Sequence, residues 1–119
     1  MEVLRLEWEG MPHSLRFVRS LLPNQLIATL EIVKAETQTM VIELPKGITM
    51  EMIEQAWAAQ GQRWEMLTMP RNDKRFEALR VIWLPNGHCL QWFVLHIDNR
   101  PYDSFSATKL TKAAWEASR

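Results

Sequence analysis

The hydrophobic positions between residues 76 and 97 form two β-prone runs that flank a strong turn signal. The first run ends at Leu84, and the second begins at His88 after the tripeptide Pro85-Asn86-Gly87. Proline presets the backbone of a turn, and glycine readily adopts the positive φ that closes a type I turn with a bulge. The pattern therefore predicts a β-hairpin in which Leu84 lies opposite His88.

Alternation along the two strands assigns each side chain of this hairpin to one of two faces. One face carries Arg80 opposite Trp92, a pairing that allows the guanidinium to stack on the indole ring. The other face carries Trp83 opposite Cys89. Both faces are largely apolar, whereas a hairpin with one face in water alternates hydrophobic and polar residues. The hairpin is therefore expected in the centre of a sheet that is covered on both sides by helices or a second subunit.

Several other segments have the alternating or β-branched pattern of strands. Residues 3–8 alternate in hydrophobicity, and residues 25–34 and 40–44 are expected to form a second hairpin. Residues 62–69 are interpreted as a short strand, with a continuation of the preceding helix as the alternative.

Three segments carry helical signals. Residues 13–22 place five apolar side chains on one helical face, although a strand is the alternative interpretation. Residues 49–61 begin with a threonine suited to capping and end at a glycine, which favours a helix. A terminal helix capped by Ser104 or Ser106 is expected to follow a loop at residues 98–103.

The order of these elements predicts an α+β fold class with a single globular domain over residues 1–119. The expected architecture is a single, mostly antiparallel sheet of about five strands with two or three helices. This order is compatible with a ferredoxin-like β-α-β-β-α-β arrangement that is extended by one strand and a C-terminal helix.

Composition narrows the class of protein. The 119 residues are 47% hydrophobic and 24% charged, which is typical of a globular domain. Acidic residues near the N-terminus stand where a signal peptide would be basic, and no apolar run approaches the roughly 18 residues of a membrane span. We therefore expect a soluble, cytoplasmic protein that does not associate with membranes. The formal net charge is zero, which disfavours binding to nucleic acid through phosphate neutralisation.

The only cysteine, Cys89, is the obvious candidate for a catalytic nucleophile, since a neighbouring histidine could generate a thiolate. The predicted register argues against this chemistry, because His88 and His96 project from the opposite face of the hairpin. These two histidines are also separated along the strand by roughly 27 Å, too far to share a metal ion. The sequence therefore favours no catalytic role, no metal site and no cofactor.

Six tryptophans are the most unusual feature of the composition. Exposed aromatic rings beside an arginine on a sheet face could stack on unpaired nucleic-acid bases. Most of these tryptophans fall in predicted core segments, which favours packing over base stacking. The interaction candidates that this pattern indicates are Arg80, Trp92, Trp64 and Trp115.

Two polar loops flank the central hairpin, and functional residues often lie on such loops. One loop spans residues 70–75 and the other residues 98–103. Local hydrogen bonding and surface ion pairs are the simpler interpretation of their charges. The loop candidates are Arg71, Lys74, Arg75, Asp98, Arg100 and Asp103.

We interpret the chain as a small non-catalytic protein-interaction module that forms a homodimer or binds another protein partner. The reason is that three short helices are few for covering both apolar faces of a thin sheet. One alternative is a nucleic-acid-binding protein that uses the aromatic and arginine-bearing sheet face. Another is an enzyme or small-molecule binder with a pocket between sheet and helices.

Overall fold

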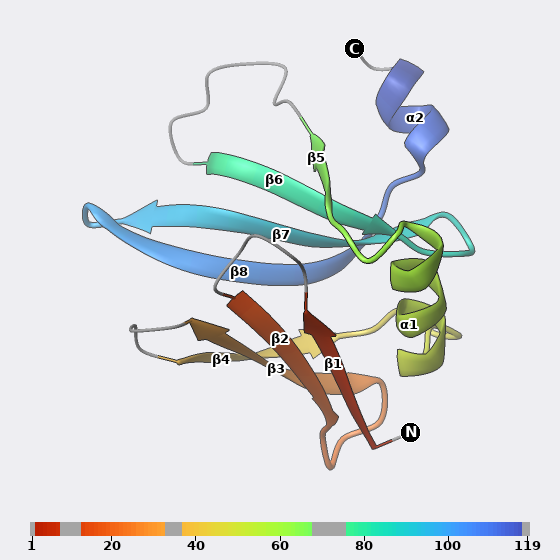
Figure 1. Ribbon diagram of the computed structural model, residues 1–119, viewed down its shortest axis with the longest axis horizontal. Helices are drawn as coiled ribbons and strands as arrows, with labels where there is room; N and C mark the ends of the chain where they lie inside the picture. The colour runs from red at the N-terminus through yellow and green to blue at the C-terminus, as the bar shows by residue number, and fades with distance from the viewer. Residues whose placement is uncertain (1, 8–12, 33–36, 68–75, 118–119) are drawn as a thin grey trace.

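The computed structural model describes residues 2–7, 13–32, 37–67 and 76–117, which form two four-stranded antiparallel sheets and two short helices (Figure 1). The first sheet contains β1 (Val3–Glu7), β2 (His13–Arg19), β3 (Gln25–Ile32) and β4 (Gln38–Glu43). The second contains β5 (Glu65–Leu67), β6 (Phe76–Trp83), β7 (His88–Ile97) and β8 (Arg100–Lys109). Helix α1 (Met50–Ala59) connects the sheets, and α2 (Lys112–Ala117) follows β8. Each sheet is a meander, because strands adjacent in sequence are also adjacent in space.

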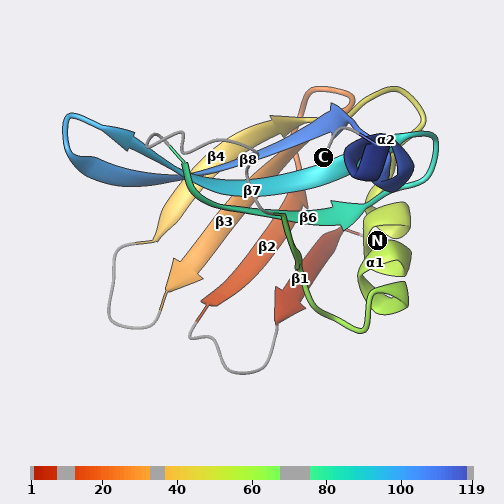
Figure 2. The ribbon, with the colours of Figure 1, turned by 90° about the horizontal axis from the view of Figure 1, so that it is seen from above.

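The two sheets stack as layers, and α1 flanks both on one side (Figures 1 and 2). The main hydrophobic core lies between the layers and joins side chains from both sheets and from α1, including Phe17, Ile53 and Trp92. In β1 the buried Leu4 and Leu6 alternate with exposed residues, as expected for a strand with one buried face. The apolar stripe of α1 fills the same core.

The sheets approach each other along β4 and β8, where the amide oxygen of Gln38 accepts a hydrogen bond from the backbone N–H of Asp103 at 3.2 Å. At the opposite side, α1 packs against both β1 and β6. The layered core is therefore bounded by a strand contact on one side and by a helix on the other.

The expected single sheet of about five strands with two or three helices is wrong, and with it the ferredoxin-like arrangement. One cause is the segment at residues 13–22, where the predicted helix is instead strand β2. Leu15 and Phe17 both enter the core, whereas Val18 faces the other side of the sheet, so the true period is two residues. The alternative interpretation of this segment, a strand, is confirmed.

The second cause is the C-terminal region, where a loop and a helix were expected and the ten-residue strand β8 is found. Asp98 and Asn99 form a two-residue turn, with φ of 52° and 60°, and Ile97 pairs with Arg100 across it. Positive φ at both central positions is the geometry of a type I′ hairpin turn, which favours Asn and Asp. The terminal helix is only the six residues of α2.

The central hairpin has the predicted register, with Arg80 opposite Trp92 and Trp83 opposite Cys89. The backbone N–H of Leu84 donates to the carbonyl of His88 at 2.9 Å, as expected for this turn. Gly87 has the predicted positive φ, 74°, but Asn86 also has a positive φ of 62°. The turn is therefore not of type I, whose second central residue has a negative φ.

Other local predictions are confirmed within the described residues. The strands expected at residues 3–8, 25–34 and 40–44 correspond to β1, β3 and β4, and the short strand expected at 62–69 is β5. Thr49 caps α1, because its hydroxyl oxygen accepts a hydrogen bond from the N–H of Met52 at 3.2 Å. The expected loop at residues 70–75 lies outside the described residues, as do residues 8, 33, 34, 68 and 69.

Candidate functional site

Four residues singled out from the sequence lie together on the inner face of the second sheet: Arg80, Trp92, Trp64 and Asp103. The Arg80 guanidinium carbon lies 4.6 Å from the Trp92 ring centroid, so the predicted cation–π contact is confirmed. The indole N–H of Trp92 donates to a carboxylate oxygen of Asp103 at 2.7 Å. The ring of Trp64 meets that of Trp92 edge-on, with centroids 5.4 Å apart.

This cluster is part of the core. Only 2% of Trp92 is exposed, and Phe105 stacks on its ring with centroids 5.5 Å apart. Partial burial lowers the pKa of Arg80, and the nearby Asp103 carboxylate partly offsets that effect. Because Arg80 and Phe105 cover the Trp92 ring, it does not offer an open platform for a nucleic-acid base.

The remaining sequence candidates lie elsewhere. Trp115 of α2 packs against a second, smaller core on the outer face of the second sheet, which contains Cys89. Asp98 and Arg100 are exposed at the turn between β7 and β8. The structure therefore does not bring these three to Arg80. The other loop candidates, Arg71, Lys74 and Arg75, lie outside the described residues.

Cys89 is fully buried, and its sulfur lies 3.6 Å from the hydroxyl oxygen of Thr108. Burial raises the pKa of the Cys89 thiol, while hydrogen bonds with Thr108 and Gln91 partly oppose the rise. A thiol in this environment stays protonated at neutral pH and is a poor nucleophile. Among the described residues, no group of three or more potential metal ligands is found. Neither of the two helices in the described part of the chain is long and apolar enough to cross a membrane.

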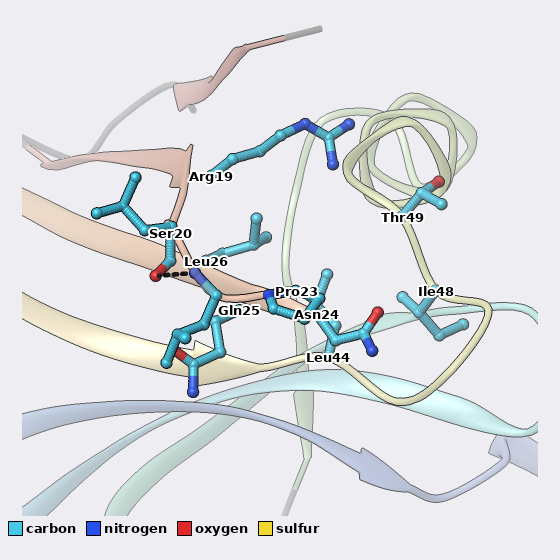
Figure 3. A pocket seen from close by; sticks show the side chains of 11 residues that line it. Arg19, Ser20, Pro23, Asn24, Gln25, Leu26, Leu44, Ile48 and Thr49 are labelled. Atoms are coloured by element: carbon cyan, nitrogen blue, oxygen red, sulfur yellow. Dashed lines mark hydrogen bonds between the residues drawn. The ribbon is translucent and has the colours of Figure 1, made fainter.

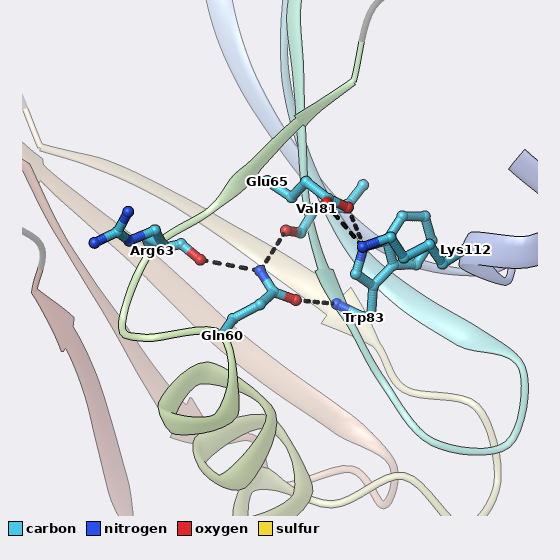
Figure 4. Close-up of polar contacts among 6 residues, drawn as sticks. All are labelled: Gln60, Arg63, Glu65, Val81, Trp83 and Lys112. Carbon is cyan, nitrogen blue, oxygen red and sulfur yellow. Dashed lines mark hydrogen bonds and ion pairs between the residues drawn. The ribbon is translucent and has the colours of Figure 1, made fainter. Parts of the chain in front are cut away.

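A polar cluster that the sequence did not indicate joins α1, β5, β6 and α2 (Figure 4). The Gln60 side chain donates to the Val81 carbonyl at 3.1 Å and accepts from the Trp83 backbone N–H at 2.8 Å. It thereby continues the pairing of β6 beyond the end of β5, which starts at Glu65. Glu65 accepts a hydrogen bond from the Trp83 indole N–H and pairs with Lys112 at 3.2 Å.

Replacing Gln60 with alanine is expected to lower the free energy of unfolding by about 1–3 kcal/mol, because it leaves backbone groups of β6 unsatisfied. Gln55→Ala is the matched control, since Gln55 is an exposed residue of the same helix. The free energy of unfolding of Gln55→Ala should stay within about 0.5 kcal/mol of that of the unmodified protein. Urea denaturation measures both variants, and equal midpoints would show that the Gln60 side chain does not support β6.

An open depression of 340 Å³ lies beside the turn between β2 and β3 (Figure 3). Its wall includes the exposed Leu21 and Leu22, and the buried Leu44 and Ile48 contribute from the segment that precedes α1. The Ser20 hydroxyl oxygen accepts a hydrogen bond from the Leu22 backbone N–H at 3.2 Å. Polar and apolar side chains contribute about equally to its lining, and none of the described residues that line it is an acid or a histidine.

The outer face of the first sheet carries an aliphatic row that crosses all four strands. Its members lie directly opposite one another across the strands, and the two outermost are 51% and 59% exposed. No described helix or strand covers this face (Figures 1 and 2). We call this set the aliphatic row: Val3, Val18, Ile27 and Val41.

Polar rows lie beside the aliphatic row on the same face. The first consists of Arg5, Arg16, Thr29 and Thr39, and the second contains Glu7, Ser14 and Glu31. Arg5 forms an ion pair with Glu31 at 3.2 Å. This surface does not follow from the sequence pattern, because the helix expected at residues 13–22 removes β2 from the sheet. The available signal was the β-branched residues on the second face of each strand.

Comparison with protein-family models, curated proteins and solved structures found no match for this chain. Its function is therefore inferred from the surfaces described above.

Proposed function

We propose that the protein is a non-catalytic protein-interaction module that self-associates through the outer face of its first sheet. The observation that carries this proposal is the aliphatic row, an uninterrupted line of β-branched side chains across four strands. A contiguous apolar patch on a protein surface often marks an interaction site, and two-fold pairing is the commonest way to bury one.

The structural support for self-association differs from the argument based on the sequence. That argument was that both apolar faces of the central hairpin need a covering layer. The inner face of the central hairpin is covered by the first sheet, and residues of the C-terminal segment, including Leu110 and Trp115, pack on its outer face. A second subunit is therefore not needed to cover that hairpin. The face that lacks a covering layer within the described residues belongs to the first sheet.

The outer face is complementary to itself under one particular symmetry. A two-fold axis parallel to the strands, between β2 and β3, exchanges β1 with β4 and β2 with β3. Val3 then meets Val41 of the second copy, and Val18 meets its Ile27, so that the aliphatic rows coincide. Stacked sheets of this kind lie about 10 Å apart.

The same two-fold axis places charged residues of one copy opposite hydroxyl-bearing residues of the other. Arg16 faces Thr29 of the second copy, and Arg5 faces Thr39. Glu31 faces Ser14, so no two like charges oppose each other.

Sedimentation equilibrium tests self-association. At tens of micromolar the protein is expected to have about twice its monomer mass of 14.0 kDa. Ile27→Lys places a charge in the middle of the aliphatic row and should weaken association by at least about a hundredfold, because an unpaired buried charge costs several kcal/mol.

Leu21→Lys is the control, since Leu21 is fully exposed and lies outside the row. It should leave the dimer intact. A monomeric wild-type protein at tens of micromolar, or a dimer that tolerates Ile27→Lys, would contradict the proposal.

A further inference from the structure

A groove of 560 Å³ runs between the free edge of β1 and helix α1. This volume lies within the range of ligand-binding clefts, about 300–1,000 Å³. The groove is distinct from the aliphatic row, which faces away from the core. Figure 2 shows β1 at the end of the first sheet on the side of α1.

The groove has the backbone of β1 as one wall. It contacts four consecutive residues of that strand, from Leu4 to Glu7, although Leu4 and Leu6 point into the core and are almost fully buried. Successive side chains of a strand face opposite sides, so a cavity that touches all four must lie along the edge of the strand. An edge strand presents unpaired N–H and C=O groups there.

The other wall is one face of α1 and its C-terminal continuation. Glu54 and Ala58 lie one turn apart on α1, Gln62 follows the end of the helix, and Trp57 closes the groove toward the core. Ala58 has a short side chain at the middle of this wall, which leaves space beside β1. A partner that enters the groove therefore meets strand backbone on one side and a helix surface on the other.

The charges of the groove favour a basic occupant. The exposed Glu7 and Glu54 both line the groove. The third charged side chain, Arg5, has its guanidinium engaged by Glu31 on the outer face at 3.2 Å. Two carboxylates are thus left to meet cationic side chains.

We propose that this groove binds an extended, lysine- or arginine-bearing segment of a protein partner, which adds a strand to the edge of β1. Backbone hydrogen bonds to β1 hold the segment, and its cationic side chains lie beside Glu7 and Glu54. This is the mode of β-strand addition, in which main-chain pairing supplies affinity and side-chain contacts supply specificity.

Fluorescence anisotropy with a labelled acetyl-Lys-Val-Lys-Val-Lys-Val-amide peptide tests the proposal. Binding should be saturable and at least about tenfold tighter than for the Glu-Val counterpart. Replacing the central valine by proline removes a backbone donor and fixes φ, and should weaken binding by a similar factor. Equal affinity for the acidic or proline-containing peptide would overturn the proposal.

Two matched variants locate the site. Ala58→Arg fills the groove and should abolish binding of the Lys-Val peptide, whereas Ala59→Arg adds the same side chain at an exposed position outside the groove and should leave it unchanged. Ile27→Lys should also leave peptide binding unchanged, which separates this site from self-association. The assignment of a peptide to this groove would be overturned if the Ala58→Arg variant bound the Lys-Val peptide as wild type does. It would also be overturned if this variant changed the sedimentation mass and left peptide binding intact.

Discussion

Trp92→Ala is expected to lower the free energy of unfolding by about 3–5 kcal/mol, the range observed for truncation of large buried aromatic residues. The Trp92 ring fills the space between Arg80, Phe105 and Trp64, and its N–H binds the Asp103 carboxylate. Alanine leaves a cavity and also removes the partner of a half-buried carboxylate. Because domains of this kind are stabilised by about 5–15 kcal/mol, the variant will lose much of its stability.

Urea denaturation measures this loss, with Trp115→Ala as the control. Trp115 is half-buried on the short helix α2 and packs against the smaller core. Truncation of Trp115 should lower the free energy of unfolding clearly less than truncation of Trp92 does. Trp92→Phe should fall between wild type and Trp92→Ala, since phenylalanine keeps the stacked ring and loses the N–H donor. A Trp92→Ala midpoint equal to that of Trp115→Ala would show that the cluster does not hold the sheets together.

The central hairpin could be predicted from the sequence because its determinants are local. The residues Pro85, Asn86 and Gly87 set the turn, and the turn sets the register of every pair along both strands. The contact between Arg80 and Trp92 follows from that register alone. Thr49 is predictable for the same reason, since a cap acts on an N–H group three residues away.

The two-sheet architecture could not be predicted because the decisive segments are compatible with two periods. Leu15, Val18 and Leu22 fit a helix at intervals of three and four residues, whereas the buried pair Leu15 and Phe17 fits a strand. Pairing with β1 and β3 decides between them, and this pairing is not a property of the segment itself. Likewise, β8 forms because β7 is available as a partner after the Asp98-Asn99 turn.

The polar side-chain contacts could not be predicted either, because they also depend on segments that are distant in the sequence. Gln60 binds the backbone at Val81 and Trp83, more than twenty residues away, and no local pattern marks it. The sequence pattern predicts that Asp103 lies in a loop, but it lies on β8 and accepts the hydrogen bond of Trp92 from the paired strand β7. The aliphatic row likewise exists only when four strands are placed in register, so the surface that supports the proposed function emerges from the tertiary structure.

Cross-linking between Val3 and Val41 tests self-association through the outer face most directly. In one chain these positions lie on β1 and β4, three strand spacings or roughly 14 Å apart. In the proposed dimer, Val3 lies opposite Val41 of the second copy across the interface. The double variant Val3→Cys/Val41→Cys, treated with a short bismaleimide, should therefore become covalently dimeric.

The controls are the two single variants and the unmodified protein. Cys89 is fully buried and its thiol is protonated, so wild type should remain uncoupled. Each single variant should also remain uncoupled, because the proposed axis places equivalent positions far apart. Denaturing electrophoresis should then show a dimer band for the double variant alone. A double variant that stays monomeric, or a Val3→Cys variant that couples by itself, would contradict the proposed pairing of the outer faces.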